Sequence, residues 1–421
     1  MKNFNLRDDM TEIINSAIKS VLPESAVKEA LQREDFISRR NKGKIIVASI
    51  GKAAWRMARA AADILGENIS GAVVTKYEHS MSEIKGLEIF EAGHPVLDSN
   101  TIKGTKELLK YVKNLTADDT VLFLVSGGGS ALFELPAEGV TLTDMMSITN
   151  QLLASGADIV EINTIRKHLS AVKGGRFAKL CEPAHVYMVV LSDVLGDRLD
   201  SIASGPAWPD NSTSEEALNI VKKYSLNMKN DLLEILKQET PKELNNVTAV
   251  ITGSVTALCD SAMKFASEKG YTPLLLTTTL TCEAREAGSF MASIAREILN
   301  SGRPVKTPCA IIAGGETVVH LTGKGLGGRN QEFALSAANG IKGLENVVIA
   351  SLGSDGTDGP TDAAGGIVDG RTAVLMEKSG FEINETLKNN DAYHALKAAG
   401  ALLMTGPTGT NVNDVAIALI G

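Results

Sequence analysis

The stretch TVLFLVSGGGS, residues 120–130, decides the fold class of this chain. Its first six residues are apolar or β-branched without alternation, which is typical of a strand buried on both faces of a parallel sheet. Ligands of such sheets bind beyond the carboxyl ends of the strands, where glycine lets backbone N–H groups approach an anion. A plain tight turn is the alternative, but consecutive glycines lose much backbone entropy on folding. We therefore predict that an anion or phosphate is bound by Ser126, Gly127, Gly128, Gly129 and Ser130.

Similar strand, turn and helix patterns recur along the whole chain. Near-continuous apolar runs at residues 44–50, 185–191, 247–251 and 347–352 alternate with segments of helical period. This alternation predicts an α/β fold, with a mostly parallel sheet that carries helices on both faces.

The domain boundary is predicted from a change in composition. Residues 211–244 are polar and rich in Lys and Glu, and they end at a proline and two asparagines. We expect a larger domain over residues 1–240 and a smaller α/β domain over residues 241–421.

The bulk properties exclude several classes of protein. The chain has 421 residues, 44% of them hydrophobic, and a net charge of −8. An acidic chain offers no general surface for nucleic acid, and no apolar run reaches the ~18 residues that a membrane span needs. The four cysteines are widely spaced, which predicts reduced and buried thiols. Without a secretory signal at the N-terminus, we expect a cytoplasmic protein with no nucleic-acid or membrane partner.

Basic residues in an acidic chain are informative because a site for anions must concentrate them. Lys52 lies between a predicted strand and a predicted helix, at the positive end of the helix dipole, where a lysine is electrostatically unfavourable. This placement suggests a function for Lys52, and a solvated lysine on the first helical turn is the alternative. Arg329 ends a glycine-rich turn before another helix, and its guanidinium suits a two-pronged anion contact. Residues 166–176 form the densest basic stretch, either a site or a solvated helix face, with Lys173 and Arg176 on one side of a helix.

Three carboxylates are predicted to bind a metal ion or to act as a base. Asp193 and Asp355 each follow a buried strand, and Glu316 follows a pair of glycines. Carboxylates at strand ends suit Mg²⁺, which takes one or two of them together with substrate phosphates. The alternative is that each aspartate bonds the backbone of its own turn.

The segment GKGLGGR, residues 323–329, matches the dinucleotide pattern G-x-G-x-x-G. In dinucleotide sites this pattern normally opens the first βαβ unit, with an acidic residue about twenty positions later. Here it lies late in the chain, so it is weak evidence for a nicotinamide cofactor. No Walker A, protein-kinase or G-x-S-x-G signature is present.

Longer motifs give a more specific interpretation. Seven motifs resemble, in order and over nearly the whole chain, the class II glycerate kinases: residues 125–132 (VSGGGSAL), 191–197 (LSDVLGD), 202–206 (IASGP), 313–317 (AGGET), 327–332 (GGRNQE), 354–359 (SDGTDG) and 408–414 (TGTNVND). One departure is Cys282, where glycine is expected before Glu-Ala-Arg.

The resemblance implies ATP-dependent phosphorylation of D-glycerate to 2-phospho-D-glycerate, with Mg²⁺ or another divalent cation. It also implies a Rossmann-like amino-terminal domain, a second α/β domain and an active site in the cleft between them. The family's catalytic lysine and arginine match Lys52 and Arg329. Two other hypotheses stay open: an NAD(P)H-dependent hydroxypyruvate reductase, and a non-catalytic phosphosugar- or nucleotide-binding protein. The oligomeric state is open too, with a homodimer among the options.

Overall fold

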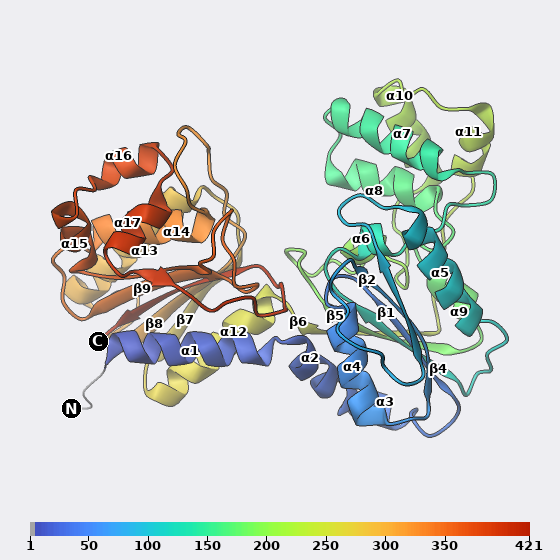
Figure 1. Ribbon diagram of the computed structural model, residues 1–421, viewed down its shortest axis with the longest axis horizontal. Coiled ribbons are helices and arrows are strands. Elements are labelled where there is room, and N and C mark those ends of the chain that lie inside the picture. The colour runs from blue at the N-terminus through green and yellow to red at the C-terminus, as the bar shows by residue number, and fades with distance from the viewer. Residues whose placement is uncertain (1–4) are drawn as a thin grey trace. The chain divides into compact units, whose positions relative to one another are not determined.

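The structure is a computed structural model that describes residues 5–421, and it divides into two compact units (Figure 1). The first unit is Pro23–Thr252. The second unit comprises the chain up to Leu22 together with Gly253–Gly421. Each unit is an α/β structure built on one six-stranded sheet, which confirms the predicted fold class.

The sheet of the first unit has the strand order β3-β2-β1-β4-β5-β6. Its strands are β1 (Ile45–Ile50), β2 (Ile69–Lys76), β3 (Leu87–Ala92), β4 (Thr120–Val125), β5 (His185–Leu191) and β6 (Val247–Gly253). The pairs from β3 to β5 are all parallel. Every residue of β1, β4 and β5 is buried, as continuous apolar strands covered on both faces require.

Helices cover this sheet and form a second small core beside it. The covering helices are α2 (Pro23–Leu31), α3 (Glu34–Ile37), α4 (Ala54–Leu65), α5 (Ser99–Tyr111), α6 (Gly129–Leu132) and α9 (Arg176–Cys181). The separate helical group, seen together in Figure 1, is α7 (Leu142–Ala154), α8 (Ile159–His168), α10 (Ser214–Lys223) and α11 (Asn230–Leu236). Its core includes Ile148, Ile165 and Leu236. Capping boxes at Thr141 and Asp158 fix where α7 and α8 begin.

The second unit has a mixed sheet in the order β11-β10-β9-β12-β8-β7. Its strands are β7 (Thr272–Leu280), β8 (Cys309–Gly315), β9 (Val347–Gly353), β10 (Gly365–Asp369), β11 (Leu402–Leu403) and β12 (Asp414–Ile420). Only β7 and β8 are parallel to each other. The last strand, β12, is buried throughout and runs antiparallel between β8 and β9. The end of the chain therefore forms the centre of this sheet.

Seven helices complete the second unit. They are α1 (Leu6–Ser20), α12 (Val255–Lys269), α13 (Ala284–Ser301), α14 (Arg329–Gly340), α15 (Thr372–Lys378), α16 (Ile383–Lys388) and α17 (Ala392–Ala398). In Figure 1, α1 and α12 lie on one face of the sheet, and α13 and α14 lie on the other. None of the helices within residues 5–421 is long and apolar enough to cross a membrane.

The division of the chain differs from the predicted split at residue 240 in two respects. Strand β6 belongs to the first sheet, where the N–H of Val186 donates to the carbonyl of Asn246 (2.7 Å). Helix α1 belongs to the second unit, where Asp9 accepts a hydrogen bond from the hydroxyl of Tyr271 (2.8 Å). Both differences depend on pairing between distant segments, which the composition change near residue 240 does not report.

Two local predictions are also corrected. The pattern of residues 160–180 predicts continuous helix, but α8 ends at His168 and α9 begins at Arg176, directly after Gly174 (φ +56°) and Gly175 (φ +83°), which adopt left-handed conformations. The apolar pattern of residues 310–321 predicts a long strand or hairpin arm, but strand β8 ends at Gly315. Three of the four free cysteines are buried as expected, but Cys282 is exposed.

Candidate active site

The glycine loop of the first unit is tied to the turn after β1. The hydroxyl of Ser126 accepts a hydrogen bond from the N–H of Ala53 (3.0 Å) and donates to the carbonyl of Ile50 (3.2 Å). The N–H of Lys52 donates to the carbonyl of Gly127 (2.9 Å). The two strand ends predicted to bind an anion therefore form one local structure.

The glycines of this loop allow three functional side chains to approach it. A Cβ atom on Gly127 would lie 2.3 Å from a carboxylate oxygen of Asp193. A Cβ on Gly128, whose φ is +82°, would lie 2.9 Å from the ring of His94 and 3.2 Å from the side chain of Lys52. Since no side chain fits at either position, the loop requires glycine for close packing against these groups. The structure thus brings Lys52, Asp193 and His94 together at the loop.

The ammonium group of Lys52 has no hydrogen-bond or ion-pair partner within residues 5–421. Close to it, desolvation lowers the pKa of His94, and the positive charge of Lys52 lowers it further. At neutral pH His94 is therefore uncharged, and it can donate and accept a hydrogen bond without repelling the lysine.

A buried ion pair stabilises the glycine loop. The ammonium of Lys173 donates to a carboxylate oxygen of Glu134 (2.5 Å) and to the carbonyl of Ser130 (2.6 Å), and both charged side chains are fully buried. Burial lowers the pKa of Lys173 to about 8, although Glu134 opposes the change. The expectation that Lys173 shares an exposed basic helix face with Arg176 is therefore wrong. The lysine stabilises the loop through its last carbonyl.

A strained segment packs against the other side of the loop. Ala203 (φ +50°) and Ser204 (φ +60°) both adopt left-handed conformations, which are costly for residues other than glycine. The Cβ of Ala203 lies 2.8 Å from the place where Gly129 would carry one, and the hydroxyl of Ser204 is 3.0 Å from that of Ser130. The loop is thus fixed at each of its five predicted residues.

Arg329 of the second unit is held firmly by carboxylates. It begins α14, and its guanidinium donates to both oxygens of Asp414 (2.5 and 3.1 Å) and to Glu316 (3.1 Å). The side chain of Asp414 is 9% exposed and that of Arg329 is 34% exposed. The arginine is therefore oriented by a buried carboxylate while part of it stays accessible.

A second buried carboxylate caps the same helix. Asp358 accepts hydrogen bonds from the N–H groups of Asn330 (3.1 Å) and Gln331 (2.8 Å) at the start of α14. Burial raises the pKa of Asp358 to about 6, despite these donors, and burial also raises the pKa of Asp414. Asp414 therefore orients the side chain of Arg329, and Asp358 holds the backbone of the two residues that follow it.

The three predicted metal or base candidates occupy different surroundings. Asp355 accepts from the N–H of Thr357 two residues later (3.0 Å), which is the turn-stabilising role given above as the alternative. Glu316 pairs with Arg329, and Asp193 lies against the glycine loop. No group of three or more His, Cys, Asp or Glu side chains within the described part of the chain could hold a metal ion. A site made of protein ligands alone is therefore not preformed there.

Comparisons with known proteins show the family of this chain. Residues 9–237 match a domain of unknown function, DUF4147, and residues 309–414 match the MOFRL family. A D-glycerate 2-kinase of Thermotoga maritima is 57% identical over 97% of both chains, and a glycerate 2-kinase of Pyrococcus horikoshii is 42% identical over 99% of this chain and 98% of the relative. The crystal structure of a Thermotoga maritima glycerate kinase matches with a TM-score of 0.95, at 56% identity over 99% of both chains. The chain belongs to the glycerate kinase (MOFRL) family.

Within this glycerate kinase family member, the G-x-G-x-x-G segment is a packing motif. The N–H groups of Gly323 and Leu326 donate to the side chains of Asn390 (2.9 Å) and Asp391 (2.9 Å), and that of Gly325 donates to the carbonyl of Asn389 (2.8 Å). Because these backbone donors are already used, the segment cannot wrap a dinucleotide pyrophosphate in this conformation. The observation removes the sequence support for a nicotinamide site.

Two residues of the candidate site were missed by the sequence interpretation. Asp414 ends a motif that was recognised, but its pairing with Arg329 joins positions 85 residues apart. His94 has no motif of its own, and only the fold brings it to Gly128.

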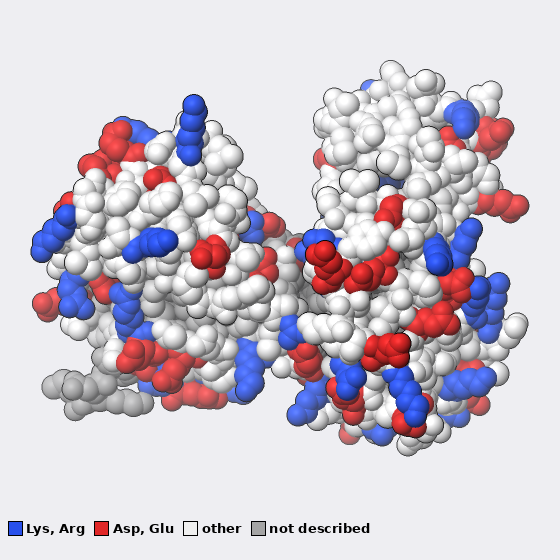
Figure 2. Space-filling model, viewed as in Figure 1, with Lys and Arg blue, Asp and Glu red and all other residues white. Residues whose placement is uncertain are grey.

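Charged side chains of both signs are interspersed on the visible face of each unit, without a large basic patch there (Figure 2).

Proposed function

We propose that this protein phosphorylates D-glycerate with ATP and yields 2-phospho-D-glycerate and ADP. The observation that carries the proposal is the ammonium of Lys52, which has no partner among residues 5–421 and lies beside the glycine loop, in a chain whose relatives are named glycerate 2-kinases. An unpaired cation next to a backbone cradle is suited to a phosphate, because phosphoryl transfer depends on positioning and on electrostatic stabilisation.

The chain's own residues take the following parts in this proposal. Lys52 neutralises negative charge on the transferred phosphoryl group, and the glycine loop holds an anion by its backbone. Asp193, beside Gly127, accepts the proton of the attacking hydroxyl group. Arg329 is oriented by Asp414 and contacts a substrate anion with the part of its guanidinium that is exposed. That Lys52 and Arg329 serve the same phosphoryl group stays a prediction.

We propose that Mg²⁺ accompanies the nucleotide rather than occupying a site of protein ligands. Mg²⁺ usually takes one or two carboxylates plus phosphate oxygens, so the lack of a three-ligand group among residues 5–421 agrees with this role. Asp193 is the candidate ligand at the loop, and Glu316 and Asp355 are the candidates in the second unit. When bound, the ion would neutralise phosphate charge.

We also propose that the protein acts in the cytoplasm. ATP-dependent turnover and four free cysteines fit that reducing compartment. A homodimer is one option for its assembly.

Product analysis tests the function directly. The protein is incubated with ATP, MgCl₂ and D-glycerate, ADP is measured with a coupled assay, and the phosphorylated carbon is assigned by phosphorus and proton NMR. We expect stoichiometric ADP and 2-phosphoglycerate. A parallel reaction follows NADH absorbance with hydroxypyruvate. NADH consumption without ADP formation would overturn the proposal in favour of the reductase.

A further inference from the structure

The first unit contains a cavity that none of the roles above uses. It lies between α8, α10 and the segment of residues 198–212, and its volume is about 540 Å³. Cavities of roughly 300–1,000 Å³ are typical of ligand sites, and a three-carbon acid would leave most of this one empty. The cavity therefore suits a ligand much larger than glycerate.

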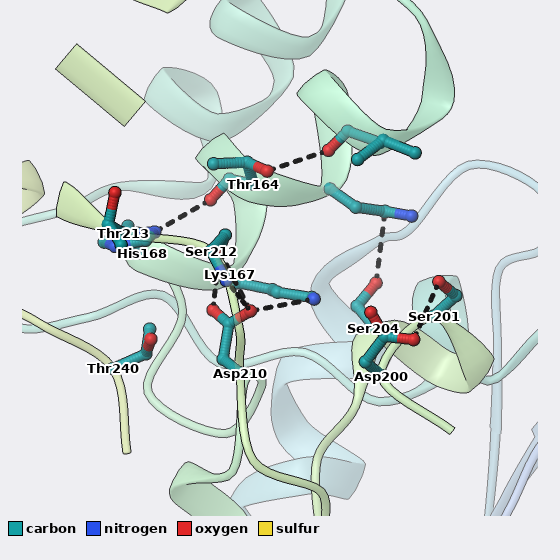
Figure 3. Close-up of polar contacts among 12 residues, drawn as sticks. Thr164, Lys167, His168, Asp200, Ser201, Ser204, Asp210, Ser212, Thr213 and Thr240 are labelled. Carbon is teal, nitrogen blue, oxygen red and sulfur yellow. Dashed lines mark hydrogen bonds and ion pairs between the residues drawn. The ribbon is translucent and has the colours of Figure 1, made fainter. Parts of the chain in front are cut away.

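Each basic side chain of the cavity wall is paired with a carboxylate. Lys223 pairs with Glu161 (2.6 Å), and Arg198 pairs with Asp200 (2.8 Å). Lys167 pairs with the buried Asp210 (3.0 Å), as Figure 3 shows. With its cations already paired, the wall is not built for a free phosphate group.

Neutral and apolar groups on the wall remain available. The amides of Asn211 and Asn219 make no hydrogen bond within the described chain, and Val160 and Ile220 contribute apolar surface. Amide groups next to apolar surface match the chemistry of a nucleobase, which has flat apolar faces and an edge of donors and acceptors.

The cavity wall is joined to the glycine loop by direct contacts. Asn163, on the wall, accepts a hydrogen bond from Ser204 (3.3 Å), whose hydroxyl is 3.0 Å from that of Ser130. On the same helix, Arg166 donates to the carbonyl of Ser130 (3.3 Å). In Figure 3 the side chain of Lys167 points from α8 toward Asp210, and Ser204 lies near Asp200 and Ser201. A ligand in the cavity therefore lies next to the structure that holds the loop.

We infer that this cavity binds the nucleoside part of ATP, so that the phosphates extend toward the glycine loop and Lys52. This inference rests on the proposed kinase function, and it assigns the nucleotide, rather than glycerate, to the helical side of the first unit. The base contacts the amides of Asn211 and Asn219 and the apolar surface of the cavity. The phosphates leave the cavity, whose cations are already paired, and reach the glycine loop.

Adjacent residues of α8 provide a matched test. Val160 lines the cavity and is 53% exposed, whereas Ile159 does not line it and is 66% exposed. Replacing Val160 with Trp fills the cavity without entering the apolar core. Ile159→Trp adds the same side chain one position away. Asn219→Trp on α10 fills the cavity from the opposite wall and serves if Val160→Trp does not fold.

Binding and kinetics are measured on the full chain. By titration calorimetry, Val160→Trp and Asn219→Trp should raise the Kd for ADP by about tenfold or more, and Ile159→Trp by less than about twofold. The KM for D-glycerate should change by less than about twofold in all three variants. Inorganic tripolyphosphate, which lacks a base, should inhibit Val160→Trp and the unaltered chain equally.

The outcomes separate this inference from the proposed function. If ADP binds both cavity variants as tightly as the unaltered chain, or if they lose affinity for glycerate instead, the cavity is not the nucleoside site, whatever the kinase assay gives. If the cavity variants bind ADP more weakly while the unaltered chain does not phosphorylate glycerate, the cavity is still the nucleoside site, but glycerate is not the substrate.

Discussion

Arg329 offers the sharpest test of the second unit because its partners are defined on the structure. Arg329→Met keeps the aliphatic stem and removes the guanidinium, which makes three hydrogen bonds to Asp414 and Glu316. We expect kcat/KM to fall by at least about 100-fold, equivalent to about 2.7 kcal/mol of lost transition-state stabilisation.

Arg329→Met should also lower the free energy of unfolding, by an amount that depends on how deeply the ion pair of Arg329 and Asp414 is buried. An exposed ion pair contributes about 0–1 kcal/mol, and breaking a buried one costs about 3–5 kcal/mol. Asp414 is 9% exposed but Arg329 is 34% exposed, so this pair falls between the two limits. We expect a loss of about 2 kcal/mol for Arg329→Met, because Asp414 remains as an unpaired carboxylate.

A double-mutant cycle separates the structural effect from the catalytic one. Asp414→Asn in the Arg329→Met background removes the unpaired charge, so the double variant should be more stable than Arg329→Met but no more active. Arg303→Met is the control, since Arg303 is 76% exposed and its partner Glu297 is 48% exposed. It should change neither property by more than about 0.5 kcal/mol.

Stability is measured by calorimetry and circular dichroism. The two tryptophans, Trp55 and Trp208, both lie in the first unit, whereas Arg329 lies in the second, so tryptophan fluorescence is not used as the probe. Turnover of Arg329→Met within about threefold of the unaltered chain would refute a catalytic role. The cycle is completed by measuring Asp414→Asn alone. If the changes in unfolding free energy of Arg329→Met and Asp414→Asn simply add up to that of the double variant, the ion-pair argument is refuted.

Three further predictions concern the loop and the helix cap. Lys52→Met should lower kcat/KM by at least about 100-fold without changing the melting temperature, because its ammonium has no partner within residues 5–421; a destabilised variant would contradict this. Gly128→Ala should lower kcat/KM by about tenfold or more, since its Cβ would meet His94 at 2.9 Å, whereas Gly139→Ala, with a similar φ of +85° but no contact closer than 3.6 Å, should cost only about 1 kcal/mol of stability and no activity. Burial raises the pKa of Asp358 from 3.8 to about 6, so the folded state retains a proton between pH 4 and 6 that the unfolded state has lost, and the contribution of this group to stability falls as pH rises through that window. The difference in melting temperature between the unaltered chain and Asp358→Asn should therefore change between pH 4 and 6 and be constant above pH 7; a constant difference across the whole range would contradict the raised pKa.

The sequence predicts the local parts of this protein well because they depend on short-range patterns. The continuous apolar run before Ser126 could only be a strand covered on both faces, and the structure buries all of β4. The placement of Lys52 at an unfavourable helix start also pointed to a function, and its ammonium is indeed unpaired within the described chain. Such features require only the chemistry of adjacent residues.

Features that depend on distant pairing could not be predicted in the same way. The basic stretch of residues 166–176 is predicted to be either a site or a solvated helix face, but the ammonium of Lys173 is buried against Glu134, which lies 39 residues earlier. The role of His94 follows from the packing of its ring against Gly128. No periodicity in the sequence encodes these contacts, since each is set by how separate strands and turns assemble.

Lys52 and Arg329, the two cations selected from the sequence, differ in their ion pairing, which gives them different roles. An ammonium without a partner gains its first counter-ion from the ligand, so the Coulomb attraction of Lys52 is available in full to a phosphate. The charge of Arg329 is already largely balanced by Asp414 and Glu316, so an anion gains less attraction from it. What Arg329 offers is a fixed direction, because two hydrogen bonds to a buried carboxylate prevent the guanidinium from rotating. Lys52 therefore contributes mainly charge and Arg329 mainly orientation, and phosphoryl transfer requires both.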